Sequence, residues 1–200
     1  KTELMSRETL VENFSLERVV KSGAIFNREK LDWMNGMYIR ELGAEELAKR
    51  LTDYWAMFPP EGQPEKVDGE YLLCIAPLIQ ERMKTLTEAS GKVGFFFDEE
   101  LRYDAAELVQ KGMDEAGSRE ALRRAAEALR VEAEFDAEAM EGRLRVLGKE
   151  LGLSARQFFG LLRVATTGSQ VSPPLFETME VLGRERCLAR IGAAAAALGG

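Results

Sequence analysis

The amino-acid sequence predicts an all-α protein built from two consecutive helical bundles. Hydrophobic residues recur at helical spacing along most of the chain, and helix-capping residues precede many of these stretches. The alternation expected of half-buried strands is missing, apart from a short aromatic run at residues 95–97. With 200 residues, 46% of them hydrophobic, the chain can form one domain or two small ones. We expect boundaries that divide it into residues 1–42, 43–103 and 104–200.

The first segment predicts a helix, a loop and a second helix. Ser22 and Gly23 interrupt the apolar pattern, and Asn27 is a suitable N-cap for the second helix. A further helix is expected over residues 44–58, where two prolines end it, followed by a polar, proline-rich loop at residues 58–70. The apolar positions of the first two helices are Leu10, Phe14, Val19, Leu31, Met34 and Tyr38.

The middle segment carries a long helical stripe that spans Pro77, where the helix either kinks or gives way to a new one. Arg82 and Lys84 lie off this stripe, so both should be reachable from solvent. On the pattern alone, Arg82 is a solvated charge or the partner of a nearby carboxylate. The stripe consists of Leu72, Ile75, Ile79, Met83 and Leu86.

Three helices are expected in the following region, over residues 104–113, 118–131 and 136–151. Their N-caps would be Asp104, Ser118 and Asp136, with glycines 117 and 152 at helix ends. Arginines 123, 124 and 130 lie among glutamates, which is typical of a salt-bridged, solvent-facing surface. The alanine-rich tail after Ile191 suggests a fraying helix end or disorder.

Residues 154–191 combine two helix starts and a glycine-bearing turn around one arginine. Ser154 and Gln157 form a capping box, and Arg163 lies beside the apolar stripe of the helix that follows. Residues 166–169 should break this helix, after which Ser172 as N-cap and Pro173 at the first helical position would start the next one. The predicted stripe is Phe158, Leu161, Leu162 and Ala165.

Two interpretations of this stretch are open from the residues alone. A helix start offers unpaired backbone N–H groups and a positive dipole end, which together with Arg163 would cradle single-stranded RNA across Ser172. The alternative is an ordinary helix start at Ser172 and Pro173. Arg163 would then interact favourably with the negative, C-terminal end of its own helix dipole.

Two separate segments resemble one protein family, in the order in which that family carries them. Residues 161–191 are LLRVATTGSQVSPPLFETMEVLGRERCLARI, which is similar to the C-terminal end of bacterial-type glutamyl-tRNA synthetases, in the anticodon-binding bundle. Residues 22–42 are SGAIFNREKLDWMNGMYIREL, which resembles the synthetase segment that follows the KMSKS loop and leads toward the tRNA stem. The resemblance implies the anticodon-binding region of a class I synthetase.

The resemblance also implies roles for individual residues. Arg163 and Ser172, with Pro173 and Leu175 packing beside them, match the family residues that hold the first two anticodon bases. Arg82 matches a basic residue that faces the third base. The implied partner is therefore the anticodon loop of the tRNA for glutamate, and an arginine at position 82 favours a protein that discriminates against glutamine tRNA.

The chain contains no histidine, which excludes catalytic triads and histidine-based zinc sites. The HIGH and KMSKS signatures with which class I synthetases bind ATP are also absent from it. We therefore expect a catalytically inactive part of a longer protein, with no cofactor of its own. ATP and magnesium would belong to the missing catalytic domain.

The charge distribution is compatible with RNA only at the C-terminal end. The net charge is −7, with 13 basic and 22 acidic side chains in residues 51–153 but five and three in residues 154–200. No signal peptide or membrane span is recognisable, so a cytoplasmic monomer with no membrane partner is expected. Cys74 and Cys187 lie in apolar helical patterns and should be buried free thiols. The alternative function is a free-standing helical adaptor that binds a protein.

Overall fold

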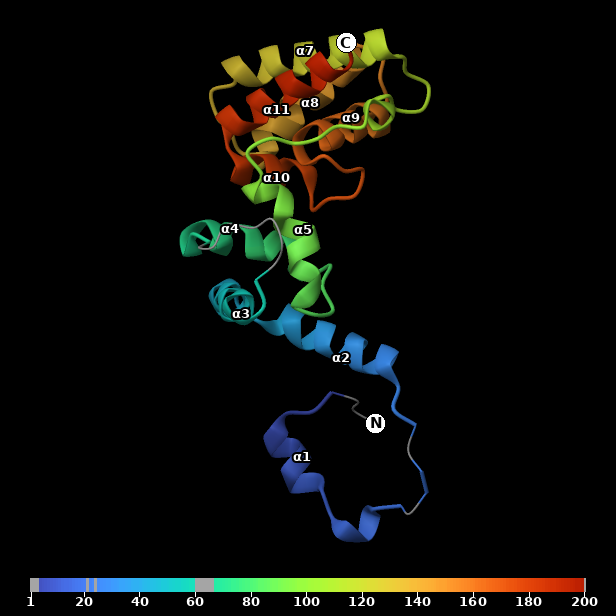
Figure 1. Cartoon of the computed structure of the whole chain (residues 1–200), viewed down its shortest axis with the longest axis vertical. Coiled ribbons are helices and arrows are strands. Elements are labelled where there is room, and N and C mark those ends of the chain that lie inside the picture. The colour runs from blue at the N-terminus through green and yellow to red at the C-terminus, as the bar shows by residue number, and fades with distance from the viewer. Residues whose placement is uncertain (1–3, 21, 24, 60–66, 200) are drawn as a thin grey trace.

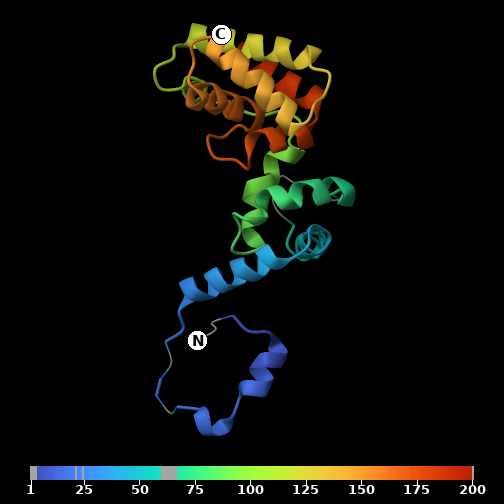
Figure 2. The same cartoon turned by 180° about the vertical axis from the view of Figure 1, so that it is seen from behind.

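The computed structural model describes residues 4–20, 22–23, 25–59 and 67–199, and this part of the chain contains helices and no strand. The helices follow one another along the long axis of the molecule, from α1 at one end to the C-terminal bundle at the other (Figure 1). Seen from behind, the same succession holds (Figure 2). The all-α class and the two consecutive bundles are confirmed.

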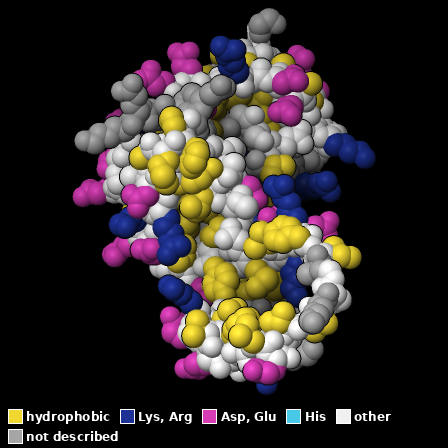
Figure 3. Space-filling view, turned by 60° about the horizontal axis from the view of Figure 1, so that its bottom comes forward, with side chains coloured by type: hydrophobic (Ala, Val, Ile, Leu, Met, Phe, Trp, Pro, Cys, Tyr) yellow, Lys and Arg dark blue, Asp and Glu magenta, His cyan; other side chains and the backbone are white. Residues whose placement is uncertain are grey.

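The N-terminal part is open and carries much exposed apolar surface. It consists of α1 (Arg7–Asn13), a 3-10 turn (Leu16–Arg18) and α2 (Arg28–Glu41). The side chain of Asn27 accepts the Lys30 N–H at 2.9 Å, which confirms the predicted cap. With this end turned forward, hydrophobic side chains cover much of the surface (Figure 3). Those exposed include Leu10, Phe14, Val19, Leu31 and Tyr38, all of which were expected on helical stripes, together with Ile25, Phe26 and Trp33.

The first bundle consists of α3 (Ala44–Met57), α4 (Gly69–Gln80) and α5 (Thr87–Phe97). Pro77 lies inside α4, so one helix continues through it, and its exposed position places the missing N–H on the solvent side. The aromatic run at residues 95–97 is the last turn of α5. Most of the loop predicted at residues 58–70 falls on residues 60–66, which lie outside the described residues.

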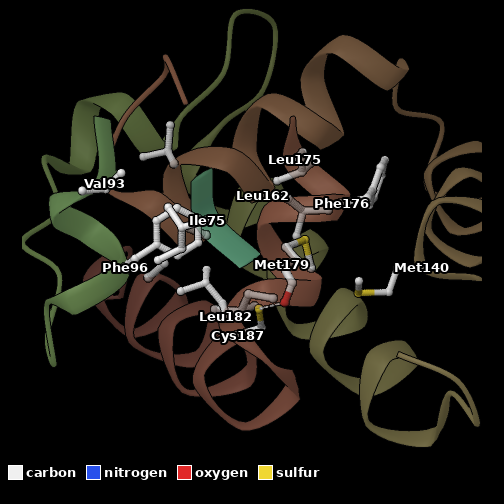
Figure 4. Close-up of a cluster of buried hydrophobic side chains, with 14 of the residues drawn as sticks. Ile75, Val93, Phe96, Met140, Leu162, Leu175, Phe176, Met179, Leu182 and Cys187 are labelled. Atoms are coloured by element: carbon white, nitrogen blue, oxygen red, sulfur yellow. Dashed lines mark hydrogen bonds between the residues drawn. The ribbon is translucent and has the colours of Figure 1, made fainter. Parts of the chain in front are cut away.

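The second bundle comprises α6 (Ala105–Leu108), α7 (Glu115–Val131), α8 (Ala137–Glu150), α9 (Ala155–Thr167), α10 (Leu175–Leu182) and α11 (Arg184–Ala197). Helix α11 packs against α7 and α9, while α10 packs against α8 and also against α4 of the first bundle. Side chains from both bundles thus share one hydrophobic core (Figure 4). Its members include Ile75, Val93, Phe96, Met140, Leu162, Leu175, Phe176, Met179, Leu182 and Cys187.

Three predictions for residues 104–131 and the C-terminal tail were wrong. The helix expected over residues 104–113 is only the single turn α6 after the Asp104 cap. Helix α7 begins three residues before Ser118, because the Asp114 carboxylate accepts the Gly117 N–H at 2.7 Å and Ser118 is buried. The alanine-rich tail continues α11 to Ala197, since alanine favours helix and the tail packs on the core. None of the described helices is long and apolar enough to cross a membrane.

The two cysteines differ in their surroundings. Cys187 is fully buried, its Sγ donates to the Met179 carbonyl at 3.4 Å, and burial raises the pKa of its thiol to about 12. Cys74 is exposed on α4, so the prediction of a buried thiol was wrong there. The helical stripe of α4 faces the other way, through Leu72 and Ile75.

The predicted salt-bridged surface is confirmed for two of its three arginines. Arg123 pairs with Glu120 at 2.7 Å and with Glu127, and Arg124 lies 3.8 Å from Glu150. These side chains are about half exposed, where such pairs contribute little to stability.

A buried arginine joins the two bundles. Arg190 of α11 is 3% exposed and donates to the carbonyl oxygens of Thr166 in α9 at 2.7 Å and of Phe95 and Asp98 at the end of α5 at 2.6 and 2.8 Å. The last carbonyls of a helix have no partner within it, so a cation can satisfy several of them at once. Burial, and secondarily the charge of Arg186, lowers the pKa of Arg190.

Replacing this arginine should therefore destabilise the protein. Arg190→Met would leave buried carbonyls without donors, and we expect the free energy of unfolding to fall by about 3 kcal/mol. Urea denaturation followed by circular dichroism measures the change. Arg123→Met is the matched control, because it removes an arginine that binds only exposed carboxylates, and its midpoint should remain that of the wild type. Equal midpoints for all three proteins would contradict the role of Arg190.

Candidate nucleic-acid interface

Helix α9 places Arg163 at the junction of the two bundles. The predicted capping box is present, with the Gln157 N–H bonded to the Ser154 hydroxyl at 3.3 Å and the Ser154 N–H bonded to the Gln157 side chain at 3.1 Å. The apolar stripe is fully buried, as expected, and Arg163 is half-buried beside it. The stripe residues are Phe158, Leu161, Leu162 and Ala165.

The helix continues two residues into the predicted break, as far as Thr167. The hydroxyl groups of Thr166 and Thr167 each donate to a carbonyl four residues earlier, both at 2.8 Å, and are therefore satisfied within the helix. Gly168 ends α9 in the left-handed conformation, with φ at 71°. Arg163 therefore lies within the last turns of a complete helix.

Ser172 does not cap a helix, which corrects the sequence prediction. Helix α10 begins at Leu175 with Pro174 as its N-cap. A proline disfavours the helical conformation of the residue before it, so Pro174 keeps Pro173 out of the helix and delays the helix start. The Ser172 hydroxyl instead accepts from Arg163 and donates to the Pro173 carbonyl at 3.1 Å. The dipole of α10 is therefore not centred on Ser172.

Two arginines converge on the backbone carbonyl of Ser172. Nη1 of Arg163 donates to this oxygen at 3.3 Å, to the Pro173 carbonyl at 2.7 Å and to the Ser172 hydroxyl. Nη1 of Arg82, from a residue 90 positions earlier in the chain, donates to the same Ser172 oxygen. Arg82 is exposed and lies in the turn at residues 81–86 that joins α4 to α5. The structure thus brings Arg82, Arg163, Ser172 and Pro173 together.

This cluster is electrostatically positive and contains N–H groups that make no hydrogen bond to the described residues. Among the described residues, no carboxylate pairs with Arg82 or Arg163, and no hydrogen bond involves Nε or Nη2 of either. Burial lowers the pKa of Arg163, and the neighbouring charge of Arg82 lowers it further. An acceptor-rich anion bound here would relieve this repulsion between the two guanidinium groups.

A pocket of about 350 Å³ lies directly beside the cluster. It is formed by α4 and α5 of the first bundle and by the segment between α9 and α10 of the second. Leu175 does not line it, because this side chain points into the shared core and is 4% exposed (Figure 4). The lining residues are Ile79, Arg82, Gly91, Lys92, Phe95, Thr167, Ser169, Val171, Ser172 and Pro173.

Lys92 and Phe95 are candidate interface residues that sequence analysis did not single out. Both come from α5, where the pattern in the sequence suggested no separate helix with an accessible face. Phe95 offers an aromatic surface, and Lys92 adds a cation whose nearest carboxylate, Glu88, is 3.9 Å away. No short motif marks either residue.

Comparisons with known proteins identify a related family. A family model described as an anticodon binding domain matches residues 46–195. A glutamate–tRNA ligase of Dehalococcoides mccartyi (strain ATCC BAA-2266 / KCTC 15142 / 195) is 48% identical over 198 residues, which cover 99% of this chain and 41% of that protein. One from Roseiflexus castenholzii is 45% identical over 98% of this chain and 39% of its own length. The chain thus spans about 40% of the length of these curated relatives.

Solved structures share the fold. The crystal structure of a glutamate tRNA ligase from Elizabethkingia meningosepticum in complex with its amino acid superposes with a TM-score of 0.83 at 24% identity. The match covers 98% of this chain and 38% of that one. The family match over residues 46–195 shows that the chain belongs to the anticodon-binding-domain family, and the curated relatives that it resembles over nearly its whole length are glutamate–tRNA ligases.

Proposed function

We propose that this chain binds the anticodon loop of the tRNA for glutamate, as the anticodon-reading part of a glutamate–tRNA ligase. The observation that carries the proposal is the convergence of Arg82 and Arg163 on the Ser172 carbonyl beside an accessible pocket. Both arginines have donors left over for a ligand, and both lack a carboxylate partner among the described residues. A polyanion with exposed hydrogen-bond acceptors is the ligand that fits this arrangement.

Single-stranded RNA satisfies these requirements better than a duplex. Unstacked bases expose their hydrogen-bonding edges to arginine and can stack on aromatic or guanidinium planes. We assign the first two anticodon bases to Arg163, Ser172 and Pro173, whereas Leu175 supports these residues from within the core. Phe95 and Lys92, which also line the pocket, supply an aromatic surface and a further cation.

We assign the third anticodon base to Arg82. Glutamate and glutamine anticodons differ at this base, which is cytosine in the first and guanine in the second. Cytosine presents adjacent acceptors, O2 and N3, to which a guanidinium can donate with two N–H groups. At the corresponding positions of its Watson–Crick edge, guanine presents the N1–H and N2–H donors, which would face the donors of Arg82, so guanine in this orientation is disfavoured by repulsion and by a lost bond.

We assign the ligase activity itself to a longer protein, of which this chain would be one part. There, glutamate would be activated with ATP and magnesium and joined to the tRNA. In the described part of this chain, no group of three or more acidic, histidine or cysteine side chains could hold a metal ion, and no step is assigned to ATP or magnesium here. The exposed apolar side chains of residues 4–40 fit our proposal that this segment connects to a catalytic domain.

Removal of Arg163 should weaken RNA binding without unfolding the chain. We expect Arg163→Ala to reduce affinity for a glutamate anticodon stem-loop by about 1 to 3 kcal/mol, through lost donors and a loosened segment at Ser172. The measurement is a titration at one fixed salt concentration, because phosphate contacts make affinity salt-dependent. Arg123→Ala removes the same charge from a distant salt-bridged surface and serves as the control. Equal affinities for both variants would contradict the assignment, provided that helicity is retained.

Substitution of Arg82 should change base preference more than overall binding. Glutamine can both donate and accept. We therefore expect Arg82→Gln to narrow the difference in binding free energy between stem-loops whose third anticodon base is cytosine or guanine by about 1 to 3 kcal/mol. The quantity measured is the ratio of the two dissociation constants, with all other bases held constant. An unchanged ratio in the variant would reject Arg82 as the reader of the third base.

A further inference from the structure

The turn that carries Arg82 is in direct contact with α2 of the N-terminal part. The side-chain amide of Asn35 donates to the carbonyl oxygen of Lys84. At the next position, a Cβ atom added to Gly36 would lie 3.3 Å from the Met83 carbonyl oxygen and 3.4 Å from the Lys84 Cα. The 3.3 Å distance is tighter than most Cβ contacts, so a side chain at this position would displace the turn by a few tenths of an ångström.

Other contacts leave this turn little freedom. Met83 is fully buried and anchors the turn in the core of the first bundle. Gln80, at the end of α4, donates from its amide to the carbonyl oxygens of Ile39 and Leu42, both at 2.8 Å. The C-terminal end of α2 and the start of the turn are therefore held together.

Arg82 is consequently placed between two surfaces. On one side its backbone belongs to a turn that rests on Asn35 and Gly36, and on the other its guanidinium bonds to Ser172 of the second bundle. A continuous set of contacts thus runs from α2 through Arg82 to the segment before α10. A small displacement of the turn would be transmitted to the position and angle of the guanidinium group.

We propose that Asn35 and Gly36 are positioning residues that set selectivity for the third anticodon base through Arg82. This inference rests on the proposed function of Arg82. Hydrogen bonds weaken steeply as their angle departs from linear, and a two-bond contact to cytosine depends on both angles. A shift of the turn by a few tenths of an ångström therefore affects base discrimination before it affects phosphate attraction, which is long-ranged.

The test compares two glycine substitutions in helix interiors. Gly36→Ala places a methyl group against the turn, whereas Gly142→Ala in α8 places one where nothing lies within 4 Å. Both changes raise helix propensity, so a general effect of alanine appears in both variants. We expect Gly36→Ala to reduce the ratio of dissociation constants for the guanine and cytosine stem-loops by about three- to tenfold. Gly142→Ala should leave this ratio at the wild-type value.

Two further variants show whether the effect passes through Arg82. Asn35→Ala, an exposed substitution that removes the bond to Lys84 without adding bulk, should also lower the ratio. In an Arg82→Gln background, Gly36→Ala should have no additional effect on the ratio. If Gly36→Ala lost its helicity, the Asn35→Ala measurement would decide the question.

The outcomes separate this inference from the proposed function. Wild-type protein that does not distinguish the two stem-loops would overturn both. If Arg82→Gln narrowed the gap while Gly36→Ala and Asn35→Ala kept the wild-type ratio, the role of α2 would be refuted and the role of Arg82 would stand. A change in the ratio caused by Gly36→Ala in the Arg82→Gln background would also refute positioning through Arg82.

Discussion

One backbone carbonyl, that of Ser172, links the two bundles at the proposed interface. A carbonyl oxygen has two lone pairs, and here Arg82 and Arg163 each donate to it from different bundles. Because the acceptor is a neutral backbone group, the positive charge of each guanidinium is not compensated by this contact. Each guanidinium also keeps N–H donors for a ligand. The interface can therefore be ordered before RNA binds and still remain positive, which lowers the cost of ordering these side chains on binding.

The same kind of contact holds the bundles together away from the interface. Arg190 satisfies carbonyls at the ends of α5 and α9, and Arg186 donates to the Phe96 carbonyl at 2.7 Å. Helix ends have unpaired carbonyls, so arginines from α11 can bind several helices at once without buried ion pairs. These contacts, together with the α2 contacts to the turn of Arg82, fix where the two proposed reading residues lie relative to each other.

The sequence predicted the helical class and most helix positions because apolar spacing and caps are local signals. The capping box at Ser154 and the Asn27 cap are examples. It failed at Ser172, where two consecutive prolines moved the helix start to Leu175, a conflict between two local rules. It grouped Arg82 with Arg163 only by family resemblance, since the bond of each to Ser172 is a tertiary contact. The role of Gly36 was not predictable, because a close approach between α2 and a distant turn leaves no pattern in the sequence.

The central claim is that Arg82 and Arg163 act as one RNA-binding unit through Ser172. A double-mutant cycle tests it most directly, with binding of one glutamate anticodon stem-loop measured for wild type, Arg82→Ala, Arg163→Ala and the double variant at fixed salt. Residues that share a partner are expected to be coupled, here by about 0.5 to 3 kcal/mol. A parallel cycle with Arg123→Ala in place of Arg82→Ala should show additive effects. If the Arg82 and Arg163 effects were additive as well, the account of a shared site would be contradicted.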